Sequence, residues 1–150
     1  FFSKKITNNI TNEEDMNISE VLQKIKLEAE EEITLKIDIE GDEYNIVDDI
    51  LSYEKNIAQI VIEYHDTHKK KDLFFNNIKK FQKFYNIIHI HGNNYRDFNP
   101  DGFPINIEIT FCKKKYVNEN SKKSYIFPIQ KLDFPNNPKS SDLQIKFEKN

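Results

Sequence analysis

One nine-residue segment decides the fold expected of this chain: Ile33-Thr34-Leu35-Lys36-Ile37-Asp38-Ile39-Glu40-Gly41. Apolar side chains alternate with polar ones along this segment, and β-branched residues dominate, which is typical of a β-strand. A glycine then stops the pattern. The segment therefore predicts a strand that ends at Gly41.

Helices and strands are expected to alternate outward from this segment. Apolar residues recur at helical spacing over residues 18–31, 43–53 and 70–83, which predicts three helices. Residues 57–65 and 86–91 predict two largely apolar strands, the kind found where both faces of a parallel sheet are covered. The order strand, helix, strand, helix, strand implies right-handed crossovers and a mostly parallel α/β sheet.

The last third of the chain predicts a change of strand direction. Residues 105–113 alternate as a fourth strand after a polar loop of about ten residues, which is too short for a crossover helix, so the third and fourth strands should be antiparallel neighbours. Residues 143–147 predict a short terminal strand. We expect one globular domain with a polar lead-in over 1–17 and an extended C-terminal segment over 114–150.

Composition narrows the classes of function. The 22 basic and 25 acidic residues leave a net charge of −3, without the positive field that nucleic-acid binding requires. The single cysteine, Cys112, cannot form an internal disulfide, which favours a reducing cytoplasm. No apolar run approaches a membrane span, so a soluble protein is expected. Position 1 is phenylalanine, so an upstream portion of the protein is expected as well.

Polar residues gather at the predicted ends of three consecutive strands. The pairs are Asp38 and Glu40, then Glu63 and His65, then His89 and His91, followed by Asn93 and Asn94. Spacing by two directs both side chains of a pair to one face of the sheet. Ligands bind beyond the carboxyl ends of strands in open α/β sheets, so Asp38, Glu40, His65 and His91 are expected to converge on one cleft. The plain alternative is that these groups are only solvated strand ends.

Aspartate, glutamate and histidine also suit Mg, Mn or Zn, but this spacing is not diagnostic and no metal is assigned. A metal-dependent hydrolase built on Asp38, Glu63 and His91 stays open as a weaker alternative. The chain has three glycines and contains neither a phosphate-binding loop nor a nucleophile elbow.

Several segments resemble the FkbM-type class I S-adenosylmethionine (SAM)-dependent methyltransferases. The signature-like segment is Leu35-Lys36-Ile37-Asp38-Ile39-Glu40-Gly41-Asp42-Glu43, and residues 60–65, 89–94, 104–111 and 132–138 are similar to later parts of the family. The similarity covers roughly residues 18–148.

This resemblance implies the C-terminal half of a Rossmann-like methyltransferase sheet, namely strands four to seven with the last strand antiparallel. It implies SAM as cofactor and a hydroxyl acceptor, such as a sugar or glycan. Asp38 then occupies the position that faces the reacting methyl group, and so contributes to cofactor binding. His65 is the expected general base, since an imidazole with a pKa near ~6.5 suits proton transfer at neutral pH. Glu40 would orient His65 or bind the acceptor, and the acceptor pocket would include Glu63, His91, Asn93 and Asn94.

The chain also departs from the family. The glycine motif that binds SAM and the acidic residue that binds its ribose have no counterpart here. We therefore expect this fragment to be inactive alone and to need an N-terminal half, a partner chain or a second copy of itself. The alternative is a non-catalytic binding or assembly module that keeps the methyltransferase-like half-sheet.

Overall fold

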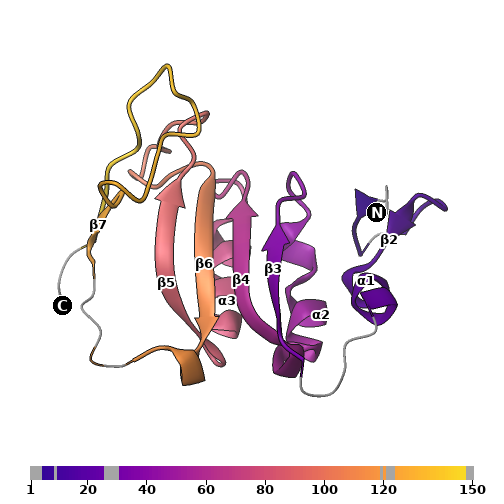
Figure 1. Cartoon of the computed structure of the whole chain (residues 1–150). Coiled ribbons are helices and arrows are strands. Elements are labelled where there is room, and N and C mark those ends of the chain that lie inside the picture. Colours follow the sequence, from indigo (N-terminus) through magenta and orange to yellow (C-terminus); the bar gives the residue numbers. More distant parts are fainter. Residues whose placement is uncertain (1–4, 9, 26–30, 119, 121–123, 148–150) are drawn as a thin grey trace.

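A four-stranded sheet forms the centre of the computed structural model, which describes residues 5–8, 10–25, 31–118, 120 and 124–147 (Figure 1). Its strands are β3 (Ile33–Ile37), β4 (Ile57–Tyr64), β5 (Tyr85–Gly92) and β6 (Ile107–Lys113). Their order across the sheet is β3-β4-β6-β5. The strand predicted over residues 33–41 is therefore present, although it ends at Ile37, and it forms one edge of the sheet.

Strand directions make this a mixed sheet. β3 and β4 are parallel, whereas β6 is antiparallel to both of its neighbours, β4 and β5. The carboxyl ends of β3, β4 and β5 consequently lie at the same edge. The expected α/β class and the antiparallel pairing of β5 with β6 are confirmed. The sequence did not reveal that β6 is inserted between β4 and β5.

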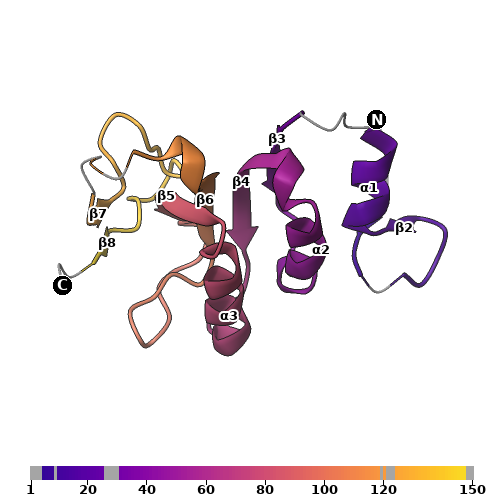
Figure 2. The same ribbon diagram turned by 90° about the horizontal axis from the view of Figure 1, so that it is seen from below.

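Helices α2 (Val47–Ser52) and α3 (Lys71–Phe81) cover one face of the sheet, and α1 (Ile18–Ile25) lies beside α2 (Figure 2). The main core forms between this face and the helices, where Ile60, Ile62 and Tyr64 of β4 are fully buried. The helix predicted over 43–53 is divided into a 3-10 turn, η1 (Glu43–Asn45), and α2. The helix predicted over 18–31 ends at Ile25 as far as the structure describes it, because residues 26–30 lie outside the described part.

Short elements complete the fold. They are β1 (Lys5–Ile6), β2 (Asp15–Met16), η2 (Glu54–Asn56), η3 (Lys114–Tyr116), β7 (Ile126–Phe127) and β8 (Ile145–Lys146). β7 and β8 pair with each other, and Phe127 and Ile145 add their side chains to the core. The predicted terminal strand is thus present, although it is only two residues long. In the described part of the chain, no helix is long and apolar enough to cross a membrane.

Candidate functional site

A tight turn after β3 positions the first acidic residues of the candidate site. Glu40 and Gly41 have positive φ angles of 55° and 113°, and the Gly41 value is one that glycine adopts far more readily than other residues. The turn brings Glu43 back under the end of the strand, where its Oε1 accepts the backbone N–H groups of Ile39 and Gly41 at 3.2 and 3.0 Å. Glu43 is fully buried. The turn at Gly41, shortly after β3, therefore holds the buried carboxylate of Glu43 in place at this edge of the sheet.

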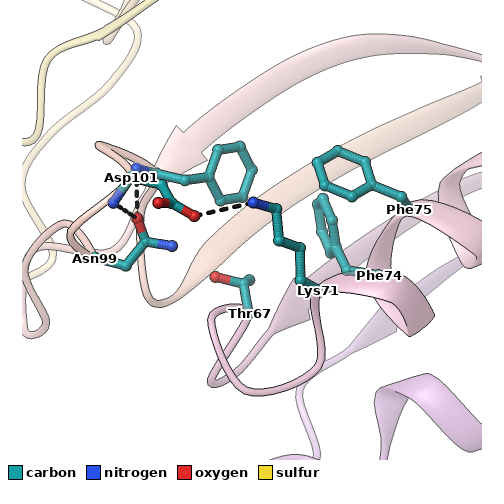
Figure 3. A pocket seen from close by; sticks show the side chains of 7 residues that line it. Thr67, Lys71, Phe74, Phe75, Asn99 and Asp101 are labelled. Carbon is teal, nitrogen blue, oxygen red and sulfur yellow. Dashed lines mark hydrogen bonds and ion pairs between the residues drawn. The ribbon is translucent and has the colours of Figure 1, made fainter.

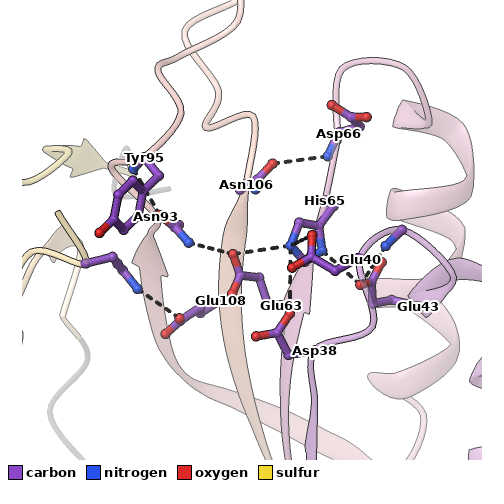
Figure 4. A network of polar contacts seen from close by, with 12 residues as sticks. Asp38, Glu40, Glu43, Glu63, His65, Asp66, Asn93, Tyr95, Asn106 and Glu108 are labelled. Atoms are coloured by element: carbon purple, nitrogen blue, oxygen red, sulfur yellow. Dashed lines mark hydrogen bonds and ion pairs between the residues drawn. The ribbon is translucent and has the colours of Figure 1, made fainter. Parts of the chain in front are cut away.

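His65 follows β4 and is held by this carboxylate (Figure 4). Its Nδ1 lies 2.8 Å from Oε1 of Glu43, and its backbone carbonyl accepts the hydroxyl of Tyr44 at 2.6 Å. Two backbone N–H groups already donate to Oε1 of Glu43, so this oxygen carries no proton of its own and can only accept from Nδ1. The proton of neutral His65 is therefore assigned to Nδ1. The lone pair of Nε2 is then free to act as a base or as a ligand.

Three carboxylates surround Nε2 of His65. Their oxygens lie at 3.8 Å for Asp38, 3.5 Å for Glu40 and 3.6 Å for Glu63. These separations exceed ordinary hydrogen-bond lengths of ~2.7 to 3.2 Å. Asp38 and Glu40 are exposed, whereas the side chain of Glu63 is only 6% exposed. The imidazole thus links a buried carboxylate to two that face solvent.

Opposing effects act on the pKa of the Glu63 carboxyl group. Burial raises the pKa of its carboxyl group, and the nearby carboxylates of Asp38 and Glu108 raise it further. Opposing this, the amide of Asn93 donates to Glu63 Oε1 at 2.7 Å, and His65 also lowers the pKa. The predicted site residues Asp38, Glu40, Glu63, His65 and Asn93 are therefore brought together, and we call them the His65 cluster.

His91 lies on the same face of the sheet but has other partners. It pairs in register with Glu108, which pairs in turn with Glu63, so two strand spacings of ~5 Å separate its backbone from that of Glu63. Its Nε2 lies 2.9 Å from Asp142 and its Nδ1 lies 3.9 Å from Glu108. Asp38, Glu40 and His65 thus lie close together, whereas the ring of His91 contacts Asp142 and Glu108 and not these residues. The hydrolase alternative, which needs Asp38, Glu63 and His91 around one point, loses support.

Asn94 and His89 secure the C-terminal segment instead of lining the His65 cluster. The amide of Asn94 donates to the carbonyls of Asn137, Ser140 and Ser141. His89 Nε2 lies 2.8 Å from Asp133. The role expected for Asn94 in acceptor binding has no counterpart in these contacts.

Sequence reasoning missed Glu43, Glu108 and Asp142 as partners of the histidines. Glu43 could have been found, since it is the last acidic residue of the signature-like segment and lies two residues after Gly41. Glu108 lies in the alternating strand with the same phase as the other polar residues of this face. No pattern pointed to Asp142, because it lies 51 positions from His91 in the sequence.

A separate cavity of about 190 Å³ lies between α3 and the loop that joins β5 to β6 (Figure 3). Its lining residues are Thr67, Lys71, Phe74, Phe75, Asn99, Asp101 and Phe103. Lys71 and Asp101 form an exposed ion pair of 2.9 Å across it. The lining includes no residue of the His65 cluster, although Thr67 follows His65 by two positions.

The contact of His91 with the C-terminal segment predicts a loss of stability at alkaline pH. Glu108 and Asp142 raise the pKa of His91 to about 9, and the charge of Asp133 adds to the effect. Because the folded pKa is above the ordinary value of ~6.5, the stabilisation is complete below pH ~6.5 and is lost as pH rises through 9. Between pH 6 and pH 10, the free energy of unfolding measured with urea should fall by up to about 3 kcal/mol more for the wild type than for His91→Gln.

An exposed histidine provides the control for this measurement. His68→Gln should show the same pH dependence as the wild type, because His68 is exposed and lies outside the contacts of His91. Equal alkaline losses in the wild type and His91→Gln would contradict the assignment.

The chain matches no known protein-family model, and no curated protein or solved structure is detectably similar to it.

Proposed function

We propose that this chain forms the acceptor side of a SAM-dependent O-methyltransferase that acts on a hydroxyl group of a sugar or glycan. The observation that carries the proposal is His65, held at Nδ1 by buried Glu43 and directing Nε2 toward the exposed carboxylates of Asp38 and Glu40. This arrangement provides a base at the sheet edge where α/β folds bind ligands.

The topology supports the same proposal. The resemblance implies strands four to seven of a methyltransferase sheet, with the last strand antiparallel. The parallel pair β3 and β4 and the reversed strand β6 are compatible with such a half-sheet. β3 would then be strand four, and Asp38 would follow it at the position that the resemblance places next to the methyl group.

The described residues do not fit SAM by themselves. Gly41 lies in the turn over Glu43, its carbonyl accepts the ammonium group of Lys70, and Gly92 packs against Leu143. Neither glycine therefore provides the turn that would hold the nucleotide, and we derive no step through SAM. SAM would supply the methyl group, and it would be bound by a segment or chain that completes the sheet beside β3.

The residues of this chain account for the acceptor. Asp38 and Glu40 would accept hydrogen bonds from neighbouring hydroxyl groups of the acceptor and so position the reacting hydroxyl group beside His65. Nε2 of His65 would accept the hydroxyl proton as the oxygen becomes nucleophilic. The resulting imidazolium would be stabilised by Glu43 and by buried Glu63.

The proposal predicts how the 150-residue chain behaves alone. It should bind SAM weakly or not at all, because residues 31–118 and the other described parts of the chain provide no nucleotide-binding turn. It should also self-associate, because β3 is the sheet edge and no described strand pairs with its outer side. Calorimetry with SAM and light scattering test both expectations.

A monodisperse monomer that binds SAM with micromolar affinity would show that the cofactor site is misplaced. The same measurements on the full-length protein test the alternative. A full-length protein that neither binds SAM nor methylates a glycan acceptor would favour the non-catalytic binding or assembly module.

A further inference from the structure

We propose that Asp38, Glu40 and Nε2 of His65 bind a divalent transition-metal cation such as Mn²⁺. One ligand atom from each of these residues lies within 4.8 Å of the other two. Glu63 Oε1 lies 3.6 Å from Nε2 and closes the group from the buried side. The existence of the site does not depend on methyl transfer, but its role in catalysis rests on the proposed function.

The orientation of His65 is the first argument for a cation. Metal-binding histidines commonly donate their second ring nitrogen to a carboxylate, which fixes the tautomer and directs the free lone pair at the metal. Glu43 has this relation to His65, with Oε1 at 2.8 Å from Nδ1 and a fully buried side chain. His65 is itself only 13% exposed, so the direction of Nε2 is set by packing as well.

The balance of charge is the second argument. Asp38, Glu40, Glu43 and Glu63 all lie within 4 Å of one imidazole, and none of them forms an ion pair with a lysine or arginine among the described residues. The nearby ammonium group of Lys70 is directed to the Gly41 carbonyl at 2.6 Å and to the ring of Tyr44. With a cation on Nε2 the imidazole is neutral, so the four carboxylates together carry up to four negative charges. A divalent cation offsets two of them.

Distances and donor types select the class of cation. Two donors that are each ~2.1 Å from a metal lie roughly 3.0 to 3.4 Å apart at octahedral or tetrahedral angles. The carboxylate oxygens of Asp38 and Glu40 lie 3.8 and 3.5 Å from Nε2, and the three ligand atoms lie within 4.8 Å of one another. The two exposed side chains would therefore have to move closer together to complete the geometry. Mixed imidazole and carboxylate ligands suit Mn²⁺ and Zn²⁺ better than Ca²⁺, which prefers oxygen ligands alone.

The cation would deepen the proposed mechanism by changing the role of His65. A hydroxyl group that binds the cation is acidified, so the acceptor would lose its proton more easily at neutral pH. His65 would then hold the cation instead of taking the proton itself, and the hydroxyl proton would pass to solvent water at the open side of the site. Asp38 and Glu40 are exposed and leave an open side from which an acceptor could enter.

The test is a titration of the 150-residue chain with MnCl₂. Calorimetry and electron paramagnetic resonance of bound Mn²⁺ measure the binding during the titration. We expect one saturable site per chain. His65→Ala and Asp38→Asn should each lower the affinity by roughly 100-fold, and Glu43→Gln by about 10- to 100-fold. His68→Ala should bind as the wild type does, because His68 lies outside the cluster.

Asp38 is 43% exposed, so Asp38→Asn should fold even if a buried variant does not. Absence of saturable binding, or binding that is equal in Asp38→Asn and the wild type, would overturn the cation site. Full-length protein separates the two proposals. Methyl transfer that is insensitive to EDTA but lost in His65→Ala would overturn the cation and retain the methyltransferase. Cation binding without methyl transfer to any glycan acceptor would do the reverse.

Discussion

In the proposed methyltransferase, replacing His65 with alanine is expected to slow methyl transfer by roughly 10² to 10⁴-fold while leaving SAM affinity little changed. The alanine removes the nitrogen that lies within 4 Å of Asp38, Glu40 and Glu63. It does not alter a nucleotide-binding turn, because the described part of this chain contains none. Turnover assays and calorimetry with SAM measure the two quantities separately.

Two further variants make this result specific. Glu43→Gln keeps the size of the side chain but weakens the hold on Nδ1, so we expect a smaller loss of turnover together with a shifted pH profile. His68→Ala removes an exposed histidine three residues further along the chain and should retain wild-type turnover. Wild-type turnover in His65→Ala would remove this residue from the mechanism.

The sheet was largely predictable because its signals are local. Alternation along residues 33–39 and the apolar stretch over 57–65 specify strands, and the short loop before β6 specifies an antiparallel turn. The insertion of β6 between β4 and β5 was not predictable, because it depends on which strand edges remain free once the sheet assembles. The break at Ile46 between η1 and α2 was missed because the apolar residues Ile46, Val47 and Ile50 keep helical spacing across it.

The same distinction between local signals and contacts made only in the assembled fold applies to the candidate site. Asp38, Glu40, Glu63 and His65 follow parallel strands, so the phase of each strand and a shared edge were sufficient to group them. His91 follows the same rule in the sequence, yet its ring contacts Asp142 across 51 residues. Strand phase predicts the face on which a side chain lies. It does not predict which distant loop reaches that side chain first.

Replacing Phe81 with alanine is expected to lower the free energy of unfolding by about 3 to 5 kcal/mol. Phe81 is the last residue of α3 and is fully buried, with its ring centroid 4.7 Å from that of Phe111 on β6 and 6.2 Å from that of Tyr85 on β5. Alanine would leave a cavity between the helix and the two strands. Urea unfolding followed by circular dichroism measures the loss.

Leu73 in the same helix provides the matched control, because its side chain is 49% exposed. Leu73→Ala should change the free energy of unfolding by no more than about 0.5 kcal/mol, as is usual for surface positions. The contrast tests the placement of α3 against the inserted strand β6, on which the register of Glu108 between Glu63 and His91 depends. Similar losses from both variants would mean that α3 does not pack on the sheet through Phe81, and the position of β6 would then need to be revised.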